Sequence, residues 1–518
     1  ECSVPKTVLK NFMDAGVKDK VALMDGFTKE TATYGELYQR TYSCAKSLKD
    51  RFGVQKGACV GILSPNHINF FTAFHGVGLT GGCSTTINPM YVEDEIEYQL
   101  KTTNAMMLIV HPLCLDKGLA VAKKLDIPVL TMGEATDEVS SFDDLLLEPI
   151  EKCEPEKLGA DNNIDSLMTI PFSSGTTGLA KGVMLTHRNL ISNFYQSMTL
   201  EGQYMTNANI IIPLPFFHAF GMVMGMCMPL MVAAKVVLLP AFDMIKFLEL
   251  IQSEKITRAY LVPPIILGLA KHPIVDKYDM SSLKCVLSGA APLGADVQNE
   301  CAKRLGILVK QGWGMTELSP VATITDERPE DNTTGSCGYL LPKTEAKIIN
   351  VETRETLAPT ELGELAIRGP QVMRGYLNNK EATTGIMTED GFMLTGDIAH
   401  FDEKGMLYVV DRCKELIKYK GFQVAPAELE ALIGSMPQVK DVVVIPVLDD
   451  DAGEIPRAYV VKQDGVELTE SEVTDFVASK VAPHKKLRGG VVFSPEIPRS
   501  ASGKILRRVQ VDMDRAKK

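Results

Sequence analysis

The stretch with the clearest chemical potential is a run of hydroxyl and glycine residues that ends in a lysine: Ser173-Ser174-Gly175-Thr176-Thr177-Gly178-Leu179-Ala180-Lys181-Gly182. Glycines let the backbone turn its N–H groups toward an anion, hydroxyls add donors, and Lys181 adds a positive charge. This combination predicts a cradle for a triphosphate. It is not a Walker loop, because no Gly-Lys-Ser/Thr follows at the required spacing and Val183–Thr186 predicts a strand. Composition alone also allows a flexible turn.

The elements around this run predict an α/β fold. Through roughly the first 400 residues, amphipathic helices alternate with short β-branched runs, a pattern that implies βαβ units. We therefore expect a large N-terminal domain of βαβ-rich, largely parallel sheets covered by helices. The predicted strands include Ala58–Leu63, Met107–Val110, Lys235–Leu239, Ala259–Val262 and Cys285–Ser288.

The pattern changes after Asp411 and predicts a smaller α+β unit. Pro426 opens a helix, Thr469 with Glu472 forms a capping box for a second helix that ends near Val481, and three strands are expected. These strands are Val442–Pro446, Arg457–Lys462 and Val491–Phe493. We predict domains at residues 1–411 and 412–518, with a hinge near Lys414. The smaller one is either a mobile lid or a fixed second domain.

Composition argues against nucleic-acid binding. The chain has 54 basic and 65 acidic residues and a formal net charge of −11, whereas nucleic-acid binding needs Lys and Arg concentrated on one face. Eleven cysteines without C-x-x-C spacing predict free, buried thiols in a reducing compartment.

One uncharged stretch, Ala208–Ala234, imitates a membrane span. Pro213, Pro215 and Pro229 interrupt it, and a span needs roughly 20 helix-compatible apolar residues. We expect a strand, a loop and a buried helix here, and no transmembrane segment.

The hydroxyl–glycine run resembles the phosphate loop of the adenylate-forming superfamily, which includes acyl-CoA synthetases, 4-coumarate–CoA ligases and beetle luciferases. Six further signatures of that family follow in its order along essentially the whole chain. They are Ser288-Gly289-Ala290-Ala291-Pro292-Leu293, Gln311-Gly312-Trp313-Gly314-Met315-Thr316-Glu317, Gly363-Glu364-Leu365-Ala366-Ile367-Arg368-Gly369, Thr395-Gly396-Asp397, the segment from Asp411 to Val424, and Pro498-Arg499-Ser500-Ala501-Ser502-Gly503-Lys504.

The resemblance implies an ATP-dependent, AMP-forming carboxylate–CoA ligase. Such an enzyme adenylates an organic acid, expels pyrophosphate, and passes the acyl group to the thiol of coenzyme A. Its catalysis is mostly positioning and electrostatic stabilisation, because charge builds on phosphate oxygens. ATP, Mg²⁺, CoA and a small carboxylic acid are the implied cofactors and substrates.

The resemblance also assigns the nucleotide site. Thr176, Thr177 and Lys181 would hold the departing phosphates, and Glu317 would bind Mg²⁺, which prefers hard oxygen ligands. Trp313 and the Gly289–Ala291 backbone would sandwich the adenine. The implied nucleotide set is Ser173, Ser174, Gly175, Thr176, Thr177, Gly178, Lys181, Gly289, Ala290, Ala291, Gln311, Gly312, Trp313, Gly314, Met315, Thr316, Asp397, Arg412, Lys414 and Lys504.

Two half-reactions divide the remaining roles. Asp397, assisted by Arg412, would accept from the ribose hydroxyls, and Lys504 would bridge the substrate carboxylate and phosphate. After adenylation the small domain would rotate about Lys414 and bring Lys418 to the site. The implied catalytic residues are Lys504, Lys418, His218, Thr176 and Glu317, and those implied for CoA are Lys420, Gly421, Phe422 and Gln423.

The acid pocket is implied at His218, Phe220, Pro320 and Val321. A lone histidine in an apolar run is more often a satisfied core residue, which is the alternative for His218. Pro320-Val321 replaces a small Ser-Ala pair of luciferases, and Asn193 replaces an arginine. A fatty or arylalkanoic acid therefore fits better than luciferin.

Two alternatives remain: a luciferase-like, light-emitting oxygenase and a catalytically silent nucleotide sensor. The intact set of Lys181, Glu317, Asp397, Lys418 and Lys504 argues against a silent protein. We expect a monomer or weak homodimer. By analogy we expect a peroxisomal enzyme of fatty acid metabolism whose terminal signal is absent from this chain, and otherwise a cytoplasmic location.

Overall fold

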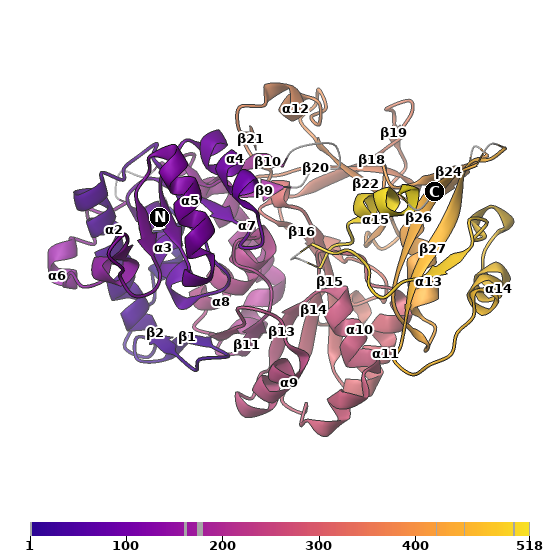
Figure 1. The fold of residues 1–518 in the computed structure, drawn as a ribbon, viewed down its shortest axis with the longest axis horizontal. Helices are drawn as coiled ribbons and strands as arrows, with labels where there is room; N and C mark the ends of the chain where they lie inside the picture. Colours follow the sequence, from indigo (N-terminus) through magenta and orange to yellow (C-terminus); the bar gives the residue numbers. More distant parts are fainter. Residues whose placement is uncertain are drawn as a thin grey trace.

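The computed structural model describes residues 3–159, 163–173, 180–420, 422–449, 451–500 and 503–516, and all structural statements refer to these ranges. A large N-terminal part and a smaller C-terminal part lie side by side, with the C-terminal part at the right of Figure 1. The first two sheets are mixed and mainly parallel, as predicted, and helices cover them.

The first sheet follows the order β17-β16-β15-β14-β13-β11-β12-β1-β2. Five of its neighbouring strand pairs are parallel, and antiparallel strands close it at both edges. Its strands are β1 (Val21–Asp25), β2 (Thr31–Thr33), β11 (Asn209–Ile212), β12 (Lys235–Leu238), β13 (Arg258–Leu261), β14 (Cys285–Ser288), β15 (Leu308–Gly314), β16 (Val321–Ile324) and β17 (Tyr339–Leu340).

The second sheet follows the order β21-β10-β8-β4-β3-β5-β6-β7, and β9 pairs with β10. Its strands are β3 (Cys59–Leu63), β4 (Cys83–Ile87), β5 (Ala105–Val110), β6 (Val129–Thr131), β7 (Ser140–Ser141), β8 (Leu167–Thr169), β9 (Phe172–Ser173), β10 (Lys181–Thr186) and β21 (Gly375–Tyr376). The predicted strand after the hydroxyl–glycine run is therefore confirmed as β10.

The third sheet was not predicted, and it corrects the expectation of parallel sheets up to residue 411. Its order is β19-β18-β20-β22-β23, and every neighbouring pair is antiparallel. Short turns connect some of these strands, and such turns can join only antiparallel neighbours. The strands are β18 (Glu345–Ile349), β19 (Thr356–Leu357), β20 (Gly363–Arg368), β22 (Met393–Phe401) and β23 (Leu407–Arg412).

The small C-terminal part has its own sheet and its own buried apolar clusters, which begin at Ile417. Its strands are β24 (Ile417–Tyr419), β25 (Phe422–Val424), β26 (Val439–Asp449), β27 (Gly453–Lys462) and β28 (Val491–Phe493). The strands predicted at Val442–Pro446 and Arg457–Lys462 are shorter than the observed β26 and β27. Antiparallel pairing extends both strands beyond their β-branched centres. The boundary at residue 411 and the hinge near Lys414 stay predictions.

Helix ends follow local capping signals. The capping box of Thr469 and Glu472 opens α14 as predicted, and a similar box of Thr33 and Glu36 opens α2. Within the described ranges, the α-helices are α1 (Val4–Leu9), α2 (Tyr34–Phe52), α3 (Ile68–Leu79), α4 (Glu93–Thr103), α5 (Leu115–Leu125), α6 (Ile150–Cys153), α7 (His187–Met205), α8 (Met228–Met231), α9 (Met244–Ser253), α10 (Pro263–Lys271), α11 (Ala295–Leu305), α12 (Lys380–Thr384), α13 (Pro426–Gly434), α14 (Glu470–Lys480) and α15 (Arg507–Arg515).

The uncharged stretch folds as predicted into a strand (β11), a loop and a buried helical segment. The helical segment combines a π-helix at Gly221–Cys227 with α8. Across the described ranges, we find no helix whose length and hydropathy would let it cross a bilayer. The ten cysteines in these ranges are free thiols, and eight of them are buried, which confirms the prediction for that part of the chain.

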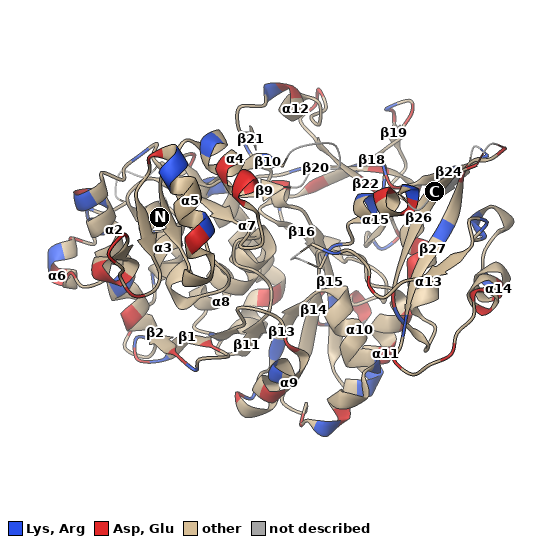
Figure 2. Ribbon diagram, in the orientation of Figure 1, with Lys and Arg blue, Asp and Glu red and all other residues tan. Residues whose placement is uncertain are grey.

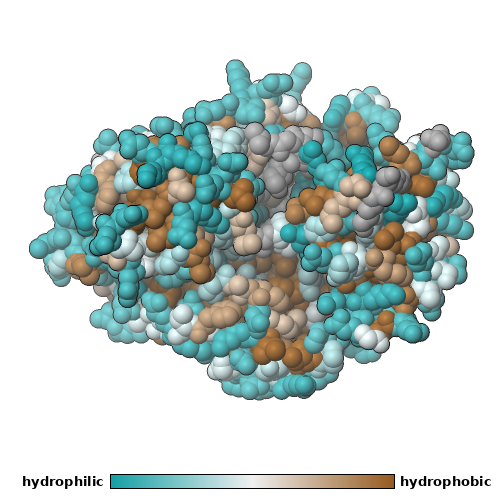
Figure 3. Space-filling model, viewed as in Figure 1, coloured by the Kyte–Doolittle hydropathy of each residue, from teal (hydrophilic) through white to brown (hydrophobic). Residues whose placement is uncertain are grey.

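The face of the molecule drawn in Figures 2 and 3 is mostly polar and mixed in charge. Figure 2 shows acidic and basic residues interspersed over the helices of both parts. In the same orientation, Figure 3 shows hydrophilic atoms over most of this face, with apolar atoms gathered in smaller areas.

Candidate active site

A pocket opens where the first sheet meets the π-helical segment. Strand β14 ends at Ser288 and leads into Gly289, and β15 ends at Gly314, so the pocket lies at the carboxyl ends of neighbouring parallel strands. Open α/β sheets commonly bind ligands at this edge. The pocket holds about 440 Å³ counted to its open mouth, and its lining residues are His218, Phe220, Leu287, Ser288, Gly289, Ala290, Gly312, Trp313, Gly314, Met315, Pro320, Val321 and Ile324.

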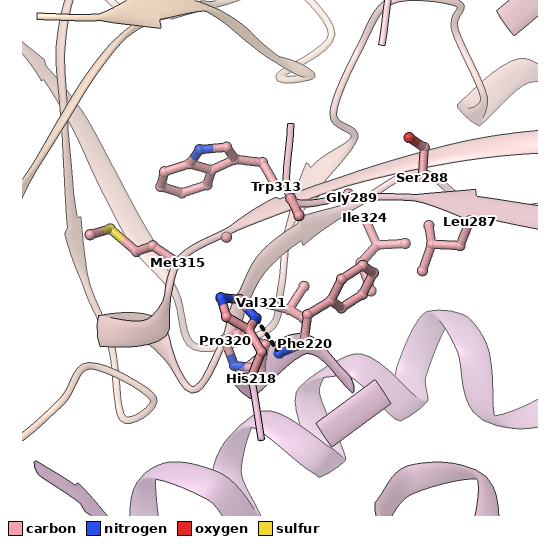
Figure 4. A pocket seen from close by; sticks show the side chains of 13 residues that line it. His218, Phe220, Leu287, Ser288, Gly289, Trp313, Met315, Pro320, Val321 and Ile324 are labelled. Carbon is pink, nitrogen blue, oxygen red and sulfur yellow. Dashed lines mark hydrogen bonds between the residues drawn. The ribbon is translucent and has the colours of Figure 1, made fainter. Parts of the chain in front are cut away.

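Close packing on a glycine shapes the inner part of this pocket. The Phe220 ring lies against Gly289 so tightly that a Cβ atom at Gly289 would sit 2.8 Å from the ring. Figure 4 shows the Phe220 ring beside Ile324, with Trp313 and Met315 on the opposite side. The structure therefore brings together all four residues predicted for the acid pocket: His218, Phe220, Pro320 and Val321.

His218 lies in the loop between β11 and the π-helix. Its Nδ1 accepts a hydrogen bond from the Phe220 backbone N–H at 3.4 Å, drawn dashed in Figure 4. Burial, and secondarily the nearby Lys504 ammonium, lowers the pKa of His218 to about 4. The imidazole is therefore neutral near pH 7 and can act as a hydrogen-bonding wall of the pocket.

Two side chains that were not predicted from the sequence hold the His218 loop. The buried Asn66 amide accepts from the Phe216 N–H at 2.7 Å and donates to the carbonyl of Leu214 at 2.8 Å. The Thr86 hydroxyl donates to the Phe217 carbonyl at 2.7 Å. Asn66 lies three residues after the end of β3, and a polar residue shortly after a buried strand was the available signal.

Asp397 joins the pocket wall to the third sheet. Antiparallel register places Asp397 on β22 opposite Arg412 on β23, and Arg412 Nε lies 2.7 Å from Asp397 Oδ1. The Trp313 indole N–H donates to Asp397 Oδ2 at 2.9 Å. Burial raises the pKa of the Asp397 carboxyl, while Arg412 and Trp313 act in the opposite direction. Both oxygens therefore have partners before any ribose hydroxyl is considered.

Lys504 of the small part reaches this group. Its backbone sits in a tight loop, where Arg499 donates to the Gly503 carbonyl at 2.7 Å and Gly503 adopts a left-handed φ of 79°. Burial and, after it, the Arg412 guanidinium lower the pKa of Lys504, while Glu415, Asp397 and Glu317 raise it. Lys504 therefore lies within the electrostatic reach of predicted nucleotide-site residues from the large part.

Glu317 is held by two hydroxyl groups. Its Oε1 accepts from Ser173 Oγ at 2.9 Å and from Tyr376 Oη at 2.9 Å, and Oε2 takes part in neither bond. The Lys181 ammonium lies 5.0 Å from the centre of the Tyr376 ring. Tyr376 was not predicted, although it comes seven residues after the Gly363–Gly369 signature. The same tyrosine thus links the predicted Mg²⁺ ligand to the predicted phosphate-binding lysine.

The donor set at Glu317 fits a magnesium ion that arrives with ATP. Among the described residues, no group of three or more His, Cys, Asp or Glu side chains could enclose a metal ion. Mg²⁺ in nucleotide sites commonly uses one or two carboxylates together with phosphate oxygens and waters. One carboxylate at this position meets that requirement.

Several predicted nucleotide residues lie elsewhere or outside the described ranges. Five residues of the predicted phosphate loop lie outside the described ranges: Ser174, Gly175, Thr176, Thr177 and Gly178. Ser173 and Lys181, at the two ends of this segment, are paired across β9 and β10. The Gln311 side chain is turned to Gln298 and to the Leu293 carbonyl. Gly312, Gly314, Met315 and Ala290 line the pocket; Ala291, Thr316 and Lys414 are not among its lining residues.

The residues predicted for CoA lie on the hairpin of β24 and β25. Lys418 and Lys420 are exposed, and the exposed Phe422 ring stacks on His484 with centroids 4.8 Å apart. Gly421 and the side chain of Gln423 lie outside what the structure describes. Neither Lys504 nor Lys418 lines the pocket, but the Lys504 ammonium lies close enough to the lining residue His218 to lower its pKa.

Asn193 supports the pocket rather than lining it. Its buried amide donates to the Val321 carbonyl at 2.7 Å and accepts from the Val321 N–H at 3.2 Å. The asparagine therefore fixes the backbone at the predicted acid-pocket residue Val321, and its own side chain is not part of the pocket lining.

Known proteins match the chain over nearly its whole length. The family described as "AMP-binding enzyme" matches residues 13–377, and "AMP-binding enzyme C-terminal domain" matches residues 428–504. The 4-coumarate–CoA ligase 1 of Petroselinum crispum is 40% identical over 499 residues, which cover 95% of this chain and 91% of that protein. The probable 4-coumarate–CoA ligase 1 of Dictyostelium discoideum is 39% identical over 533 residues, 98% of this chain and 94% of that protein.

Solved structures share the fold. ATP-bound MatB from Rhodopseudomonas palustris has a TM-score of 0.87 at 28% identity and covers 99% of both chains. The anthranilate–CoA ligase AuaEII in complex with anthranoyl-AMP has a TM-score of 0.90 at 23% identity, covering 99% of this chain and 97% of that one. At 23% identity, the similarity to AuaEII shows a shared fold alone.

Proposed function

Because this chain belongs to the AMP-binding enzymes of the adenylate-forming superfamily and is an ATP-dependent, AMP-forming acid–CoA ligase, we propose that its substrate is an acid with an apolar tail. The observation that carries the proposal is the pocket lining. Phe220, Leu287, Val321 and Ile324 form its apolar part, and His218, neutral near pH 7, is its one titratable lining residue in the described ranges. A fatty or arylalkanoic tail would bury apolar surface there, and each Å² buried would favour binding by about 25 cal/mol.

In the first step, the substrate carboxylate attacks the α-phosphorus of ATP and pyrophosphate leaves. Lys504 would offset the negative charge of the carboxylate and the α-phosphate, because its ammonium comes from the small part into the region of Asp397 and Glu317. Glu317 would hold the Mg²⁺ that accompanies ATP, and that ion would neutralise phosphate charge. Lys181 would bind the departing phosphates. Tyr376, which bonds Glu317, would keep the Lys181 ammonium near that carboxylate.

The ribose and adenine would lie along Trp313 and Asp397. The Asp397 carboxylate would accept from the ribose hydroxyls through lone pairs that Trp313 and Arg412 leave free, since a carboxylate offers about four acceptor positions. His218 would border the acid near its carboxylate end as a neutral hydrogen-bonding group.

In the second step, the CoA thiol sulfur attacks the acyl carbon, AMP leaves with the bonding electrons, and the thiol proton is lost to solvent. Lys418 and Lys420 are exposed on their hairpin and are not among the residues that line the pocket. A rotation of the small domain would exchange Lys504 for this hairpin, as expected of a mobile lid.

The decisive experiment incubates the purified chain with ATP, MgCl₂, CoA and a graded panel of acids: short and medium aliphatic acids, phenylalkanoic acids and 4-coumarate. We expect acid-dependent AMP and acyl-CoA, with the highest kcat/KM for apolar tails. Preference for short, polar or dicarboxylic acids would contradict the proposed substrate class. ADP formation, or AMP without acyl-CoA, would contradict the reaction itself. 4-Coumarate is included because similar proteins are named 4-coumarate–CoA ligases.

Two further measurements, of light emission and of ATP binding, distinguish the two alternative functions. A light-emitting oxygenase would give oxygen-dependent emission with luciferin, and a silent sensor would bind ATP without turnover. Our expectation of a monomer or weak homodimer, and of a peroxisomal enzyme of fatty acid metabolism, stays a prediction. Sedimentation analysis and imaging of the tagged protein in cells would test these two points.

A further inference from the structure

Helix α13 belongs to the small part but meets the large part along its length. Leu429 and Ile433 on this helix are fully buried in the small part's own apolar cluster, so the helix must move with that part. In Figure 1, α13 lies next to α10 and α11 of the large part. Ala431 in its middle packs on Gly294, where an added Cβ would come within 3.1 Å of the Ala431 Cβ.

Side chains of the large part bind both ends of α13. At its N-terminus, the helix has no hydrogen bond from a side chain of its own cap, Ala425. Instead, Asp411 on β23 accepts from the Ala427 N–H at 2.8 Å. At the other end, Lys271 donates to the carbonyls of Gly434 at 2.8 Å and Met436 at 3.0 Å.

The charges at the two ends suit the helix. A helix carries partial positive charge at its N-terminus and partial negative charge at its C-terminus, so an anion at the first end and a cation at the second both stabilise it. Asp411 and Lys271 have these signs. Lys271 is half-buried, and burial lowers its pKa, so its ammonium gives up water to bind the two carbonyls.

Helix α10 links the Lys271 bonds on α13 to the loop that carries Lys504. Lys271 is its last residue, and Val262 is the residue that precedes its first turn. An added Cβ at Gly503 would lie 2.9 Å from a Val262 side-chain carbon, so the loop that carries Lys504 rests against the start of the same helix. The small part therefore touches α10 at both ends: one contact is beside Lys504 and the other is Lys271.

We propose that Lys271 is a positioning residue for adenylation, which holds α13 and thereby keeps the small part oriented with Lys504 at the pocket. This inference rests on the proposed two-step reaction. Lys271 touches no substrate and acts through α13. Loss of its ammonium favours other orientations of the small part, so it weakens the step that needs Lys504 and spares the step that needs the Lys418 hairpin.

The test compares three variants in the two half-reactions. Lys271→Met keeps the aliphatic chain and removes the donor, Lys271→Arg restores a cationic donor, and Lys277→Met is a matched control, because Lys277 is exposed on the same part of the fold. We expect Lys271→Met to slow acid-dependent pyrophosphate release roughly tenfold, the scale of a lost charged hydrogen bond. Thioester formation from supplied acyl-adenylate and CoA should not slow. Lys271→Arg should recover part of the first rate, and Lys277→Met should match wild type.

Hydrogen exchange gives a readout that does not depend on turnover. Lys271→Met should speed amide exchange in α13 and in the loop around Gly503, with no change in distant helices such as α5. Equal slowing of both half-reactions, an unchanged first step, or unchanged exchange in α13 would overturn the proposal. A wild-type chain that forms no acyl-adenylate would instead overturn the proposed function, and it would do so before any variant is compared.

Discussion

The indole N–H of Trp313 donates to Asp397 Oδ2 at 2.9 Å, and this bond connects a strand of the first sheet to a strand of the third. The other carboxylate oxygen lies 2.7 Å from the Arg412 guanidinium, one strand further along. The orientation of the predicted ribose-binding carboxylate is thus fixed by two groups from two sheets. Its protonation depends on the same two groups.

Replacing Trp313 with Phe should move the acid limb of the pH profile. Burial raises the pKa of Asp397, and the Trp313 hydrogen bond lowers it. Without that N–H the pKa of Asp397 rises further. As the pH falls, the carboxylate needed for ribose binding is then protonated at a higher pH than in the wild type. We expect the acid-side fall of kcat/KM for ATP, measured between about pH 5 and 9, to shift upward. An acid limb that stays in place would disconnect Trp313 from Asp397 ionisation.

The two lysines of the small part should fail in different half-reactions. Lys504→Ala should slow acyl-adenylate formation by about 10²–10³-fold, the scale of one preorganised electrostatic donor, while thioester formation from supplied adenylate stays near normal. Lys418→Ala should show the reverse pattern. Pyrophosphate release without CoA and thioester formation from synthetic adenylate separate the steps. Equal losses in both steps for both variants would mean that the small part does not rotate.

The acid pocket should respond in opposite directions to two small substitutions. Val321→Ala should admit bulkier acids, since Val321 lines the pocket. Gly289→Ala would place a methyl group 2.8 Å from the Phe220 ring, so the ring must move and bulky acids should lose kcat/KM. The acid panel measures both effects. The KM for ATP is the control for Val321→Ala alone, because Gly289 also belongs to the predicted adenine site. Adding Phe220→Ala to Gly289→Ala should restore the bulky acids; failure to do so would place the cause elsewhere.

Asn66→Ala should weaken acid use more than nucleotide use. It removes the acceptor for the Phe216 N–H and the donor to the Leu214 carbonyl, and unsatisfied buried groups of this kind cost about 1–3 kcal/mol. The His218 loop should then shift, and kcat/KM for the acid should fall roughly tenfold while the KM for ATP changes little. Asn350→Ala, in a turn of the third sheet, is the control. A parallel loss for acid and ATP would mean general misfolding.

Buried neutral histidines should make the fold sensitive to acid. Burial lowers the pKa of His75 to about 3, against roughly 6.5 in an unfolded chain. Between these values the unfolded chain binds a proton that the folded chain does not, so the free energy of unfolding falls as the pH falls, by up to about 1.4 kcal/mol per pH unit. His75→Gln should flatten this dependence. Thermal midpoints at several pH values for both proteins measure it, and identical slopes would contradict the assignment.

The sequence by itself determined the features that short-range chemistry controls. Cys285–Ser288 and Val491–Phe493 form strands at the predicted bounds, and the Thr469–Glu472 capping box opens its helix. Ordered signature motifs identified the family, and they located His218 and Lys504 near the pocket. In each case the information lies within a few neighbouring residues, because helix caps and β-branched runs act locally.

The tertiary structure alone decided the partners of distant residues. The third sheet is antiparallel because of which strands pair, and pairing is not written in any single strand. Tyr376 bonds Glu317 across 59 positions, Asn66 bonds Phe216 across 150, and Lys271 bonds Gly434 across 163. Each is an ordinary residue in its local sequence. Its role exists only because folding brings two remote segments within hydrogen-bond distance.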